Sequence, residues 1–142
     1  NCAICLLALA LTAGCAGTRQ YVSIPSSPQL QPGDPDHVRI YLMRPKIQGA
    51  AVAVEIQEGK DIVGKLGSHG HLCWERGPGE VRIVETKYTY QPLKFNATAG
   101  STYYVAWESS VFSSSPKMRL LSQEDGLKML KQCSRKPKTA TK

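Results

Sequence analysis

The stretch that decides the fold is VRIYLM, at positions 38–43. Every second residue from Val38 onward is a branched aliphatic, and the residues between them are Arg39, Tyr41 and Met43. Successive side chains of a strand point to opposite faces, so a period of two is typical of a strand with one buried face. We therefore expect a half-buried strand here.

Further extended segments follow this one at short intervals, at positions 52–56, 62–66, 71–75, 80–90, 93–97 and 102–108. Glycine and proline separate them: Glu58–Asp61 predicts a hairpin turn, and Pro78-Gly79 fits a tight turn in which glycine supplies a positive φ. Strands at a spacing of about 8–12 residues indicate an antiparallel sandwich or barrel. The fold class we expect is all-β, an antiparallel β-sandwich of about seven short strands with one short C-terminal helix.

The C-terminal helix is predicted to begin at Ser122. The Ser122 hydroxyl can cap the amides of the first turn, and Asp125 is placed as the acidic half of a capping box. Leu127 and Leu130 share one helix face, whereas Gly126 lowers the helix propensity.

Sandwich and helix together are expected to span residues 36–133, and residues 134–142 are predicted to form a basic disordered tail. The net charge is +7, but six of the eighteen basic residues lie in the last fifteen positions. The other basic residues are scattered among carboxylates without a nucleic-acid-binding motif, so we expect no nucleic-acid partner. A basic tail beside a membrane anchor favours weak attraction to anionic lipid or an envelope polymer.

The run CAICLLALALTAG, at positions 2–14, carries no charge. It is shorter than the roughly 20 residues that a membrane-spanning helix needs. It matches the apolar region of a signal peptide, typically about 7–15 residues followed by small residues. No methionine or basic segment precedes the run, so we expect residues 1–14 to be a signal peptide whose beginning is missing.

The small residues of this run lead directly to Cys15. The sequence TAGC, at positions 12–15, resembles the lipobox of bacterial lipoproteins, in which the cysteine sulfur receives a diacylglyceryl group before a peptidase cuts ahead of it. Thr12 departs from that pattern, which usually has a larger aliphatic residue there. The resemblance predicts lipidation of Cys15; a plain secretory signal cut near Ala16 and a buried helix with an incidental cysteine are the alternatives.

Residues 15–35 contain four prolines, which exclude a long helix or a central strand. We interpret this segment as the lipidated N-terminus and a semi-extended tether. A loop packed on the surface of the domain remains the alternative for residues 21–24.

Three segments carry a family resemblance: RIYLMRP (39–45), HLCWERGPGEVRI (71–83) and AGSTYYVAWE (99–108). In this order they resemble a family of bacterial envelope lipoproteins known as domain of unknown function 2846, over about residues 36–130. The resemblance implies an all-β domain in the bacterial envelope. It supplies no established activity, so no functional residue is carried over from it.

Cysteine and histidine supply two candidate sites. Cys73 and Cys133 remain after removal of the signal and lipidation of Cys15, and an oxidising compartment favours a disulfide between them; two buried free thiols are the alternative. His69, His71 and Cys73 alternate, as ligands for a metal ion would on one strand face, but glycines around His69 suggest a turn and no fourth ligand is near. We expect neither a metal ion nor another cofactor.

Aromatic side chains are the remaining candidates for contact with a ligand. The candidates are Trp74, Trp107, Tyr103, Tyr104, Tyr88 and Tyr90. Several of these side chains could form an exposed patch, although aromatic residues commonly fill the core of a sandwich. The chain has no nucleophile elbow, metalloprotease motif or phosphate-binding loop, so we expect no catalytic residue.

These features lead to a non-enzymatic lipoprotein of the bacterial cell envelope, whose small sandwich acts as an interaction or structural module. Ala16 after the lipidated cysteine favours the outer membrane, facing the periplasm, by the sorting rule of enterobacterial lipoproteins. The expected partners are the membrane and an envelope protein or cell-wall polymer. The alternative is a module that binds cell-wall glycan or another saccharide through exposed aromatics, for which Trp74 and Trp107 must be exposed.

Overall fold

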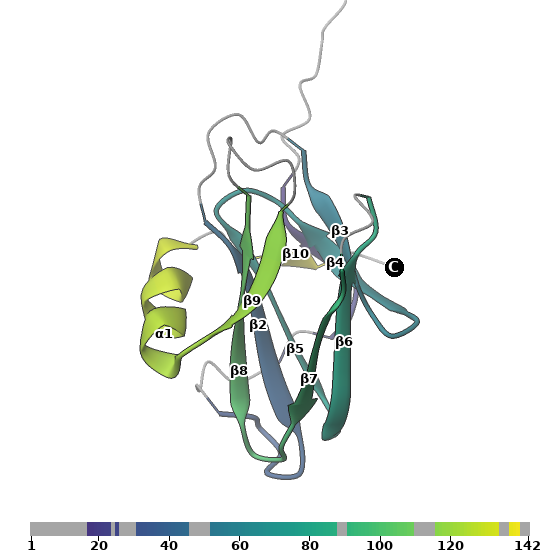
Figure 1. Ribbon diagram of the computed structural model, residues 1–142, viewed down its shortest axis with the longest axis vertical. Helices are drawn as coiled ribbons and strands as arrows, with labels where there is room; N and C mark the ends of the chain where they lie inside the picture. Colours follow the sequence, from purple (N-terminus) through teal and green to yellow (C-terminus); the bar gives the residue numbers. More distant parts are fainter. Residues whose placement is uncertain are drawn as a thin grey trace, which may run out of the picture.

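The computed structural model describes residues 17–23, 25, 31–45, 52–87, 91–109, 116–133 and 137–139. Within these residues two β-sheets lie face to face, and one helix, α1 (Gln123–Gln132), packs on the outside of the smaller sheet (Figure 1). This arrangement confirms the expected all-β sandwich with a short C-terminal helix.

The larger sheet has six strands, in the order β10-β1-β4-β3-β6-β7. They are β1 (Arg19–Gln20), β3 (Val54–Glu58), β4 (Asp61–Leu66), β6 (Gly79–Glu85), β7 (Leu93–Ala97) and β10 (Lys138–Thr139). The hairpin predicted around positions 58–61 is confirmed: β3 pairs with β4, and Gly59 between them has a φ of +60°. All neighbours are antiparallel except β1 and β10.

The smaller sheet has four strands, in the order β5-β2-β8-β9. They are β2 (Val38–Arg44), β5 (Gly70–Arg76), β8 (Thr102–Glu108) and β9 (Lys117–Leu121). β2 runs parallel to β8. The expectation of a purely antiparallel fold is therefore wrong at two pairs, β2–β8 and β1–β10, because each joins strands that are distant in the chain and not linked by a hairpin.

Three strands lie outside the set that the sequence predicts: β1, β9 and β10. β1 and β10 have two residues each, too few for a period of two to be recognised. β9 is an edge strand whose burial does not alternate strictly. The strand predicted at 80–90 ends at Glu85, and Tyr88 and Tyr90 lie outside the described residues.

The main core lies between the two sheets. Val38, Ile40 and Leu42 of β2 are all fully buried there, as the alternation in the sequence predicts. Their partners come from both sheets: Val54, Ile56, Val63, Leu66, Leu72, Trp74, Val81, Ile83, Ala97, Val105 and Trp107.

The other face of β2 is also buried, so the prediction of a half-buried strand is wrong. Tyr41 and Met43 project from this face and pack with Cys73, Tyr104 and Cys133 in a second cluster. Apolar side chains of α1 cover this cluster, and the rings of Tyr41 and Tyr104 are stacked with centroids 5.6 Å apart. The face of β2 expected to contact solvent therefore packs against the C-terminal helix.

α1 begins as the sequence predicts. The backbone N–H of Asp125 donates to the Ser122 hydroxyl at 3.1 Å, and that hydroxyl donates to the Asp125 carboxylate at 3.0 Å. The predicted N-cap is confirmed. Gly126 is buried, and a Cβ built on it would lie 2.2 Å from Cγ of Tyr104. The residue that lowers helix propensity is thus the one that lets the helix approach the sheet closely.

Candidate functional site

The predicted lipidation site, Cys15, lies outside the described residues, and Thr18 and Gln20, which follow it at short distance in the sequence, are packed in the fold. Thr18 and Gln20 are 7% and 1% exposed, and β1 pairs with β4. The interpretation of residues 15–35 as a free tether is therefore wrong for residues 17–23. The alternative of a packed loop, kept for residues 21–24, holds for the described residues 21–23, where Tyr21 N–H donates to the backbone oxygen of Val63 at 2.8 Å and Val22 packs against the main core.

Gln20 fastens this segment to the opposite sheet. Its Nε2 donates to the backbone oxygen of Cys73 at 2.6 Å, and the backbone N–H of Cys73 donates to Oε1 of Gln20 at 3.1 Å. The side-chain amide thus takes the place of a strand neighbour for β5, the edge strand of the four-stranded sheet. Sequence reasoning missed this residue, because an isolated glutamine in a two-residue strand carries no recognisable pattern.

Thr18, near the start of the described chain, forms hydrogen bonds with the turn between β4 and β5 and with Lys138, near the end of the described chain. Its hydroxyl accepts a hydrogen bond from Gly67 N–H at 3.0 Å, and its backbone oxygen accepts one from Lys138 N–H at 3.0 Å. Lys138 then continues into β10, parallel to β1. The interpretation of residues 134–142 as a disordered tail is therefore wrong for Lys138–Thr139, because β1 supplies their hydrogen-bonding partner.

The proline-rich segment is also held at a second point. Gly33 N–H donates to Oε1 of Glu75 at 2.9 Å, and the buried guanidinium of Arg39 donates to the same oxygen at 2.6 Å. Burial by itself would raise the pKa of Glu75, but these hydrogen bonds and the charge of Arg39 lower it below its usual value. Residues on both sides of the undescribed positions 26–30 thus contact the sandwich.

Cys73 and Cys133 are both buried and both free, so the candidate disulfide is not formed. They belong to one cluster beneath α1, but Cys73 interacts with the Tyr41 side chain and Cys133 with the backbone N–H of Arg44. Burial raises the pKa of each thiol to about 11. The thiolate is the nucleophilic form of cysteine, so both thiols are expected to be poor nucleophiles near neutral pH.

The candidate metal ligands are not brought together. His69 lies in the turn before β5 with a φ of +60°, and Nδ1 of His71 donates to the backbone oxygen of Cys133 at 3.0 Å. Across the described parts of the chain, no three His, Cys, Asp or Glu side chains gather in a group that could hold a metal ion.

The candidate contact aromatics lie inside the protein. Trp74, Trp107 and Tyr104 are each 3% exposed. Tyr103 is partly buried against the main core, with its ring centroid 4.9 Å from that of Phe95. The possibility of an exposed aromatic contact patch is therefore excluded for Trp74, Trp107 and Tyr104, which fill the two apolar layers of the sandwich as the core alternative predicts.

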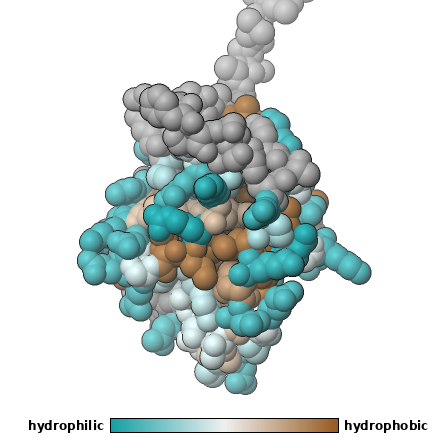
Figure 2. All heavy atoms as spheres, viewed as in Figure 1, coloured by the Kyte–Doolittle hydropathy of each residue, from teal (hydrophilic) through white to brown (hydrophobic). Residues whose placement is uncertain are grey.

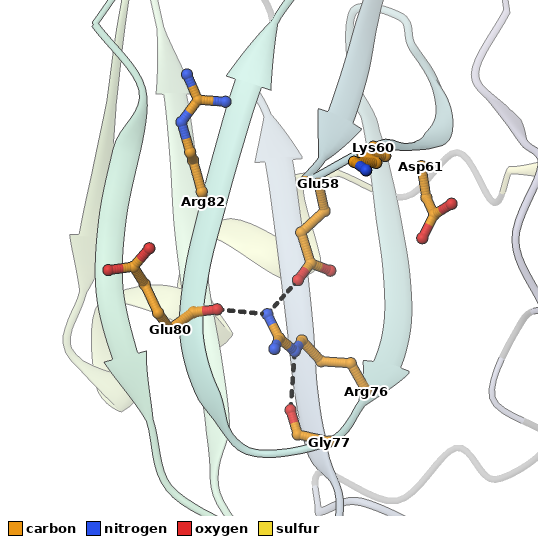
Figure 3. Close-up of a pocket in the computed structure, with 8 residues that line it drawn as sticks. Glu58, Lys60, Asp61, Arg76, Gly77, Glu80 and Arg82 are labelled. Carbon is orange, nitrogen blue, oxygen red and sulfur yellow. Dashed lines mark hydrogen bonds and ion pairs between the residues drawn. The ribbon is translucent and has the colours of Figure 1, made fainter.

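A charged pocket of about 620 Å³ lies where the β3–β4 turn meets the β5–β6 turn (Figure 3). Three acidic and three basic side chains line it together with two glycines: Glu58, Asp61, Glu80, Lys60, Arg76, Arg82, Gly59 and Gly77. Arg76 bonds Glu58 and the backbone oxygen of Glu80, and the other oxygen of Glu58 accepts from the indole of Trp74 at 2.6 Å. The charge of the Glu58 carboxylate is therefore balanced by Arg76 within the pocket. None of the lining residues is a serine, cysteine or histidine.

An apolar strip reaches the surface between β7 and β9, the edge strands of the two sheets (Figure 2). Phe95 and Met118 are only partly buried there, and Leu120 is 40% exposed. Opposite charges lie on the outward side of β9, where Arg119 pairs with Glu108 at 2.8 Å.

Comparisons with models of protein families, with curated proteins and with solved structures find no match to this chain. No helix among the described residues has the length and apolar character needed to cross a membrane.

Proposed function

We propose that this protein is a lipoprotein of the bacterial cell envelope, anchored through lipid on Cys15, whose β-sandwich is a non-enzymatic interaction or structural module. The observation that carries the proposal is the uncharged run at positions 2–14, which ends in small residues before a cysteine. The order of elements supports it, because β1, the first strand of the described residues, follows Cys15 by four residues.

The family resemblance supports the same assignment. The segments RIYLMRP and AGSTYYVAWE that carry it correspond to β2 and β8, the two central strands of the smaller sheet. We propose membership of the envelope lipoprotein family on this basis. Ala16 after Cys15 favours the outer membrane, with the sandwich on the periplasmic side.

The charged pocket supports a non-enzymatic role. Glu58 is held by Arg76 and Trp74, so it is a structural ion-pair partner rather than a general base free to take a proton. The burial of Trp74 and Trp107 argues against the alternative saccharide-binding module, because stacking on a sugar requires an exposed ring.

Metabolic labelling tests the anchor. Bacteria that express the protein are grown with radioactive palmitate, and we expect label in the wild type and none in Cys15→Ser. Cys5→Ser is the matched control, since it alters a cysteine in the same apolar run and should retain the label. Absence of label from the wild type, or label that survives Cys15→Ser, contradicts the proposal. Fractionation of the labelled cells then checks the outer-membrane location.

A further inference from the structure

Three basic residues lie side by side at one edge of the six-stranded sheet. Arg19 on β1 is directly opposite Lys65 on β4 and Lys138 on β10. Residues paired in register project from the same sheet face. All three are exposed, whereas Gln20, the next residue of β1, is buried. We call Arg19, Lys65 and Lys138 the cationic row.

No carboxylate of the described chain forms an ion pair with the cationic row. Three arginines of the smaller sheet differ from the cationic row, since Arg39, Arg76 and Arg119 each form an ion pair with a glutamate. Glu55 on β3 is opposite Lys65 in register, but its carboxylate lies by the hydroxyl of Thr86 instead. Like charges on adjacent strands repel, so the row costs the fold stability and favours an external anion.

The position of the row says which anion can reach it. Arg19 follows Cys15 by four residues, and an extended chain spans at most about 3.6 Å per residue, or roughly 14 Å in all. The headgroup layer on each side of a bilayer is about 5–7 Å thick, and charges act over a screening length of about 8 Å in physiological salt. A lipid-anchored Cys15 therefore brings the row within range of lipid headgroups.

We propose that the cationic row is a membrane-contact surface, which binds the phosphate groups of anionic lipids and brings the β10-β1-β4 edge of the larger sheet to the bilayer. The proposal rests on the lipidation of Cys15. A row across three strands, spaced about 4.8 Å apart, presents an extended line of charge and so suits a sheet of headgroups. α1 covers the opposite layer of the sandwich and is thereby left facing away from the lipid.

Lysine footprinting tests this orientation within a single molecule. The protein extracted from bacterial membranes is reconstituted in vesicles of phosphatidylcholine, with or without 30 mol% phosphatidylglycerol. Lysines are then acetylated with a neutral N-hydroxysuccinimide ester, and the rates are read by peptide mass. Lys60 in the β3–β4 turn and Lys94 on β7 are both exposed, lie away from β1 and serve as internal controls.

We expect Lys65 and Lys138 to react several-fold more slowly on anionic vesicles, with Lys60 and Lys94 unchanged. One basic residue near an anionic surface is worth about 1 kcal/mol, or roughly fivefold in affinity. Arg19→Glu should therefore remove most of the protection, and Arg82→Glu, an exposed arginine of β6, should not. Added salt should act like Arg19→Glu.

Equal rates at all four lysines on anionic vesicles overturn the proposal. Equal protection on neutral vesicles also overturns it, as does protection by inorganic phosphate without anionic lipid. The intact mass of the same sample reports whether Cys15 carries lipid. A protein without lipid refutes the anchor, whereas protection of Lys65 and Lys138 in that protein still supports the cationic row.

Discussion

At Gly126 a single missing methyl group sets the distance between helix and sheet. The glycine lies in the first turns of α1, where alanine is ordinarily favoured by about 1 kcal/mol. Here the added Cβ would lie within 2.8 Å of three atoms of the Tyr104 side chain, at 2.2, 2.5 and 2.7 Å. Tyr104 is itself stacked on Tyr41, so it cannot move aside without disturbing the second cluster.

We therefore predict that Gly126→Ala destabilises the protein. Overpacking costs about 1–3 kcal/mol, and three contacts under 3.0 Å put this site at the upper end of that range, so after a gain of about 1 kcal/mol in helix propensity the net loss is up to about 2 kcal/mol. Urea denaturation followed by circular dichroism measures it. Gly77→Ala is the control: its Cβ would meet nothing within 4 Å and its φ is not positive, so stability should change by less than about 0.5 kcal/mol. An equal effect of the two substitutions would refute this account.

At the scale of the elements, β1 connects several parts of the fold although it has only two residues. Two residues connect β10 to β4, and the Gln20 amide connects the larger sheet to β5 of the smaller one. The element is held by side-chain and backbone hydrogen bonds rather than by apolar burial. Its stability therefore depends on the satisfaction of a few buried polar groups.

We predict that Gln20→Leu weakens the attachment of β1 to β5 of the smaller sheet. It leaves the N–H and the C=O of Cys73 without the partners that Gln20 supplies, at a cost of about 2–4 kcal/mol. Hydrogen exchange should show faster exchange at the Cys73 amide and in β1. Gln132→Leu, an exposed change at the end of α1, should leave both unchanged. Unaltered exchange at Cys73 in Gln20→Leu would show that β1 is held by other means.

At the scale of the whole molecule, two buried thiols couple global stability to pH. Cys73 and Cys133 ionise near pH 9 when exposed, and burial raises their pKa values to about 11 in the folded protein. The unfolded chain therefore loses these protons first as the pH rises. The contribution to stability is complete below pH 9 and is lost between pH 9 and about 11.

Unfolding free energies measured by urea titration should therefore fall over this range. Each thiol can contribute up to about 2–3 kcal/mol, at 1.4 kcal/mol for each unit of pKa. A variant with Cys73→Ala and Cys133→Ala should show a smaller fall. Some loss should remain in it, because burial also raises the pKa of Tyr41 from 10.0 to about 12. The same fall in both proteins would contradict this prediction, and it is the result that a disulfide between the two cysteines would produce, because only the contribution of Tyr41 would then remain in the wild type.

Much of the sandwich could be predicted because its signals are local. The period of two in β2 and the cap at Ser122 report the conformational preferences of neighbouring residues. The strand, the burial of its aliphatic face and the cap are confirmed. The burial of the second face of β2 could not be predicted in this way, since it depends on where α1 returns. The aromatic contact site could not be predicted for a related reason: the sequence around Trp74 and Trp107 does not show whether their rings face solvent or the core.

The sequence by itself determined the strand periods, the helix start and the uncharged run before Cys15, because each is a property of a few consecutive side chains. Only the tertiary structure decided the strand order, the docking of β1 and β10, and the meeting of Arg19, Lys65 and Lys138. These three residues are separated by 46 and 73 positions (65 − 19 and 138 − 65). Contacts at such separations depend on which distant surfaces bury one another, and no local pattern of side chains encodes that choice.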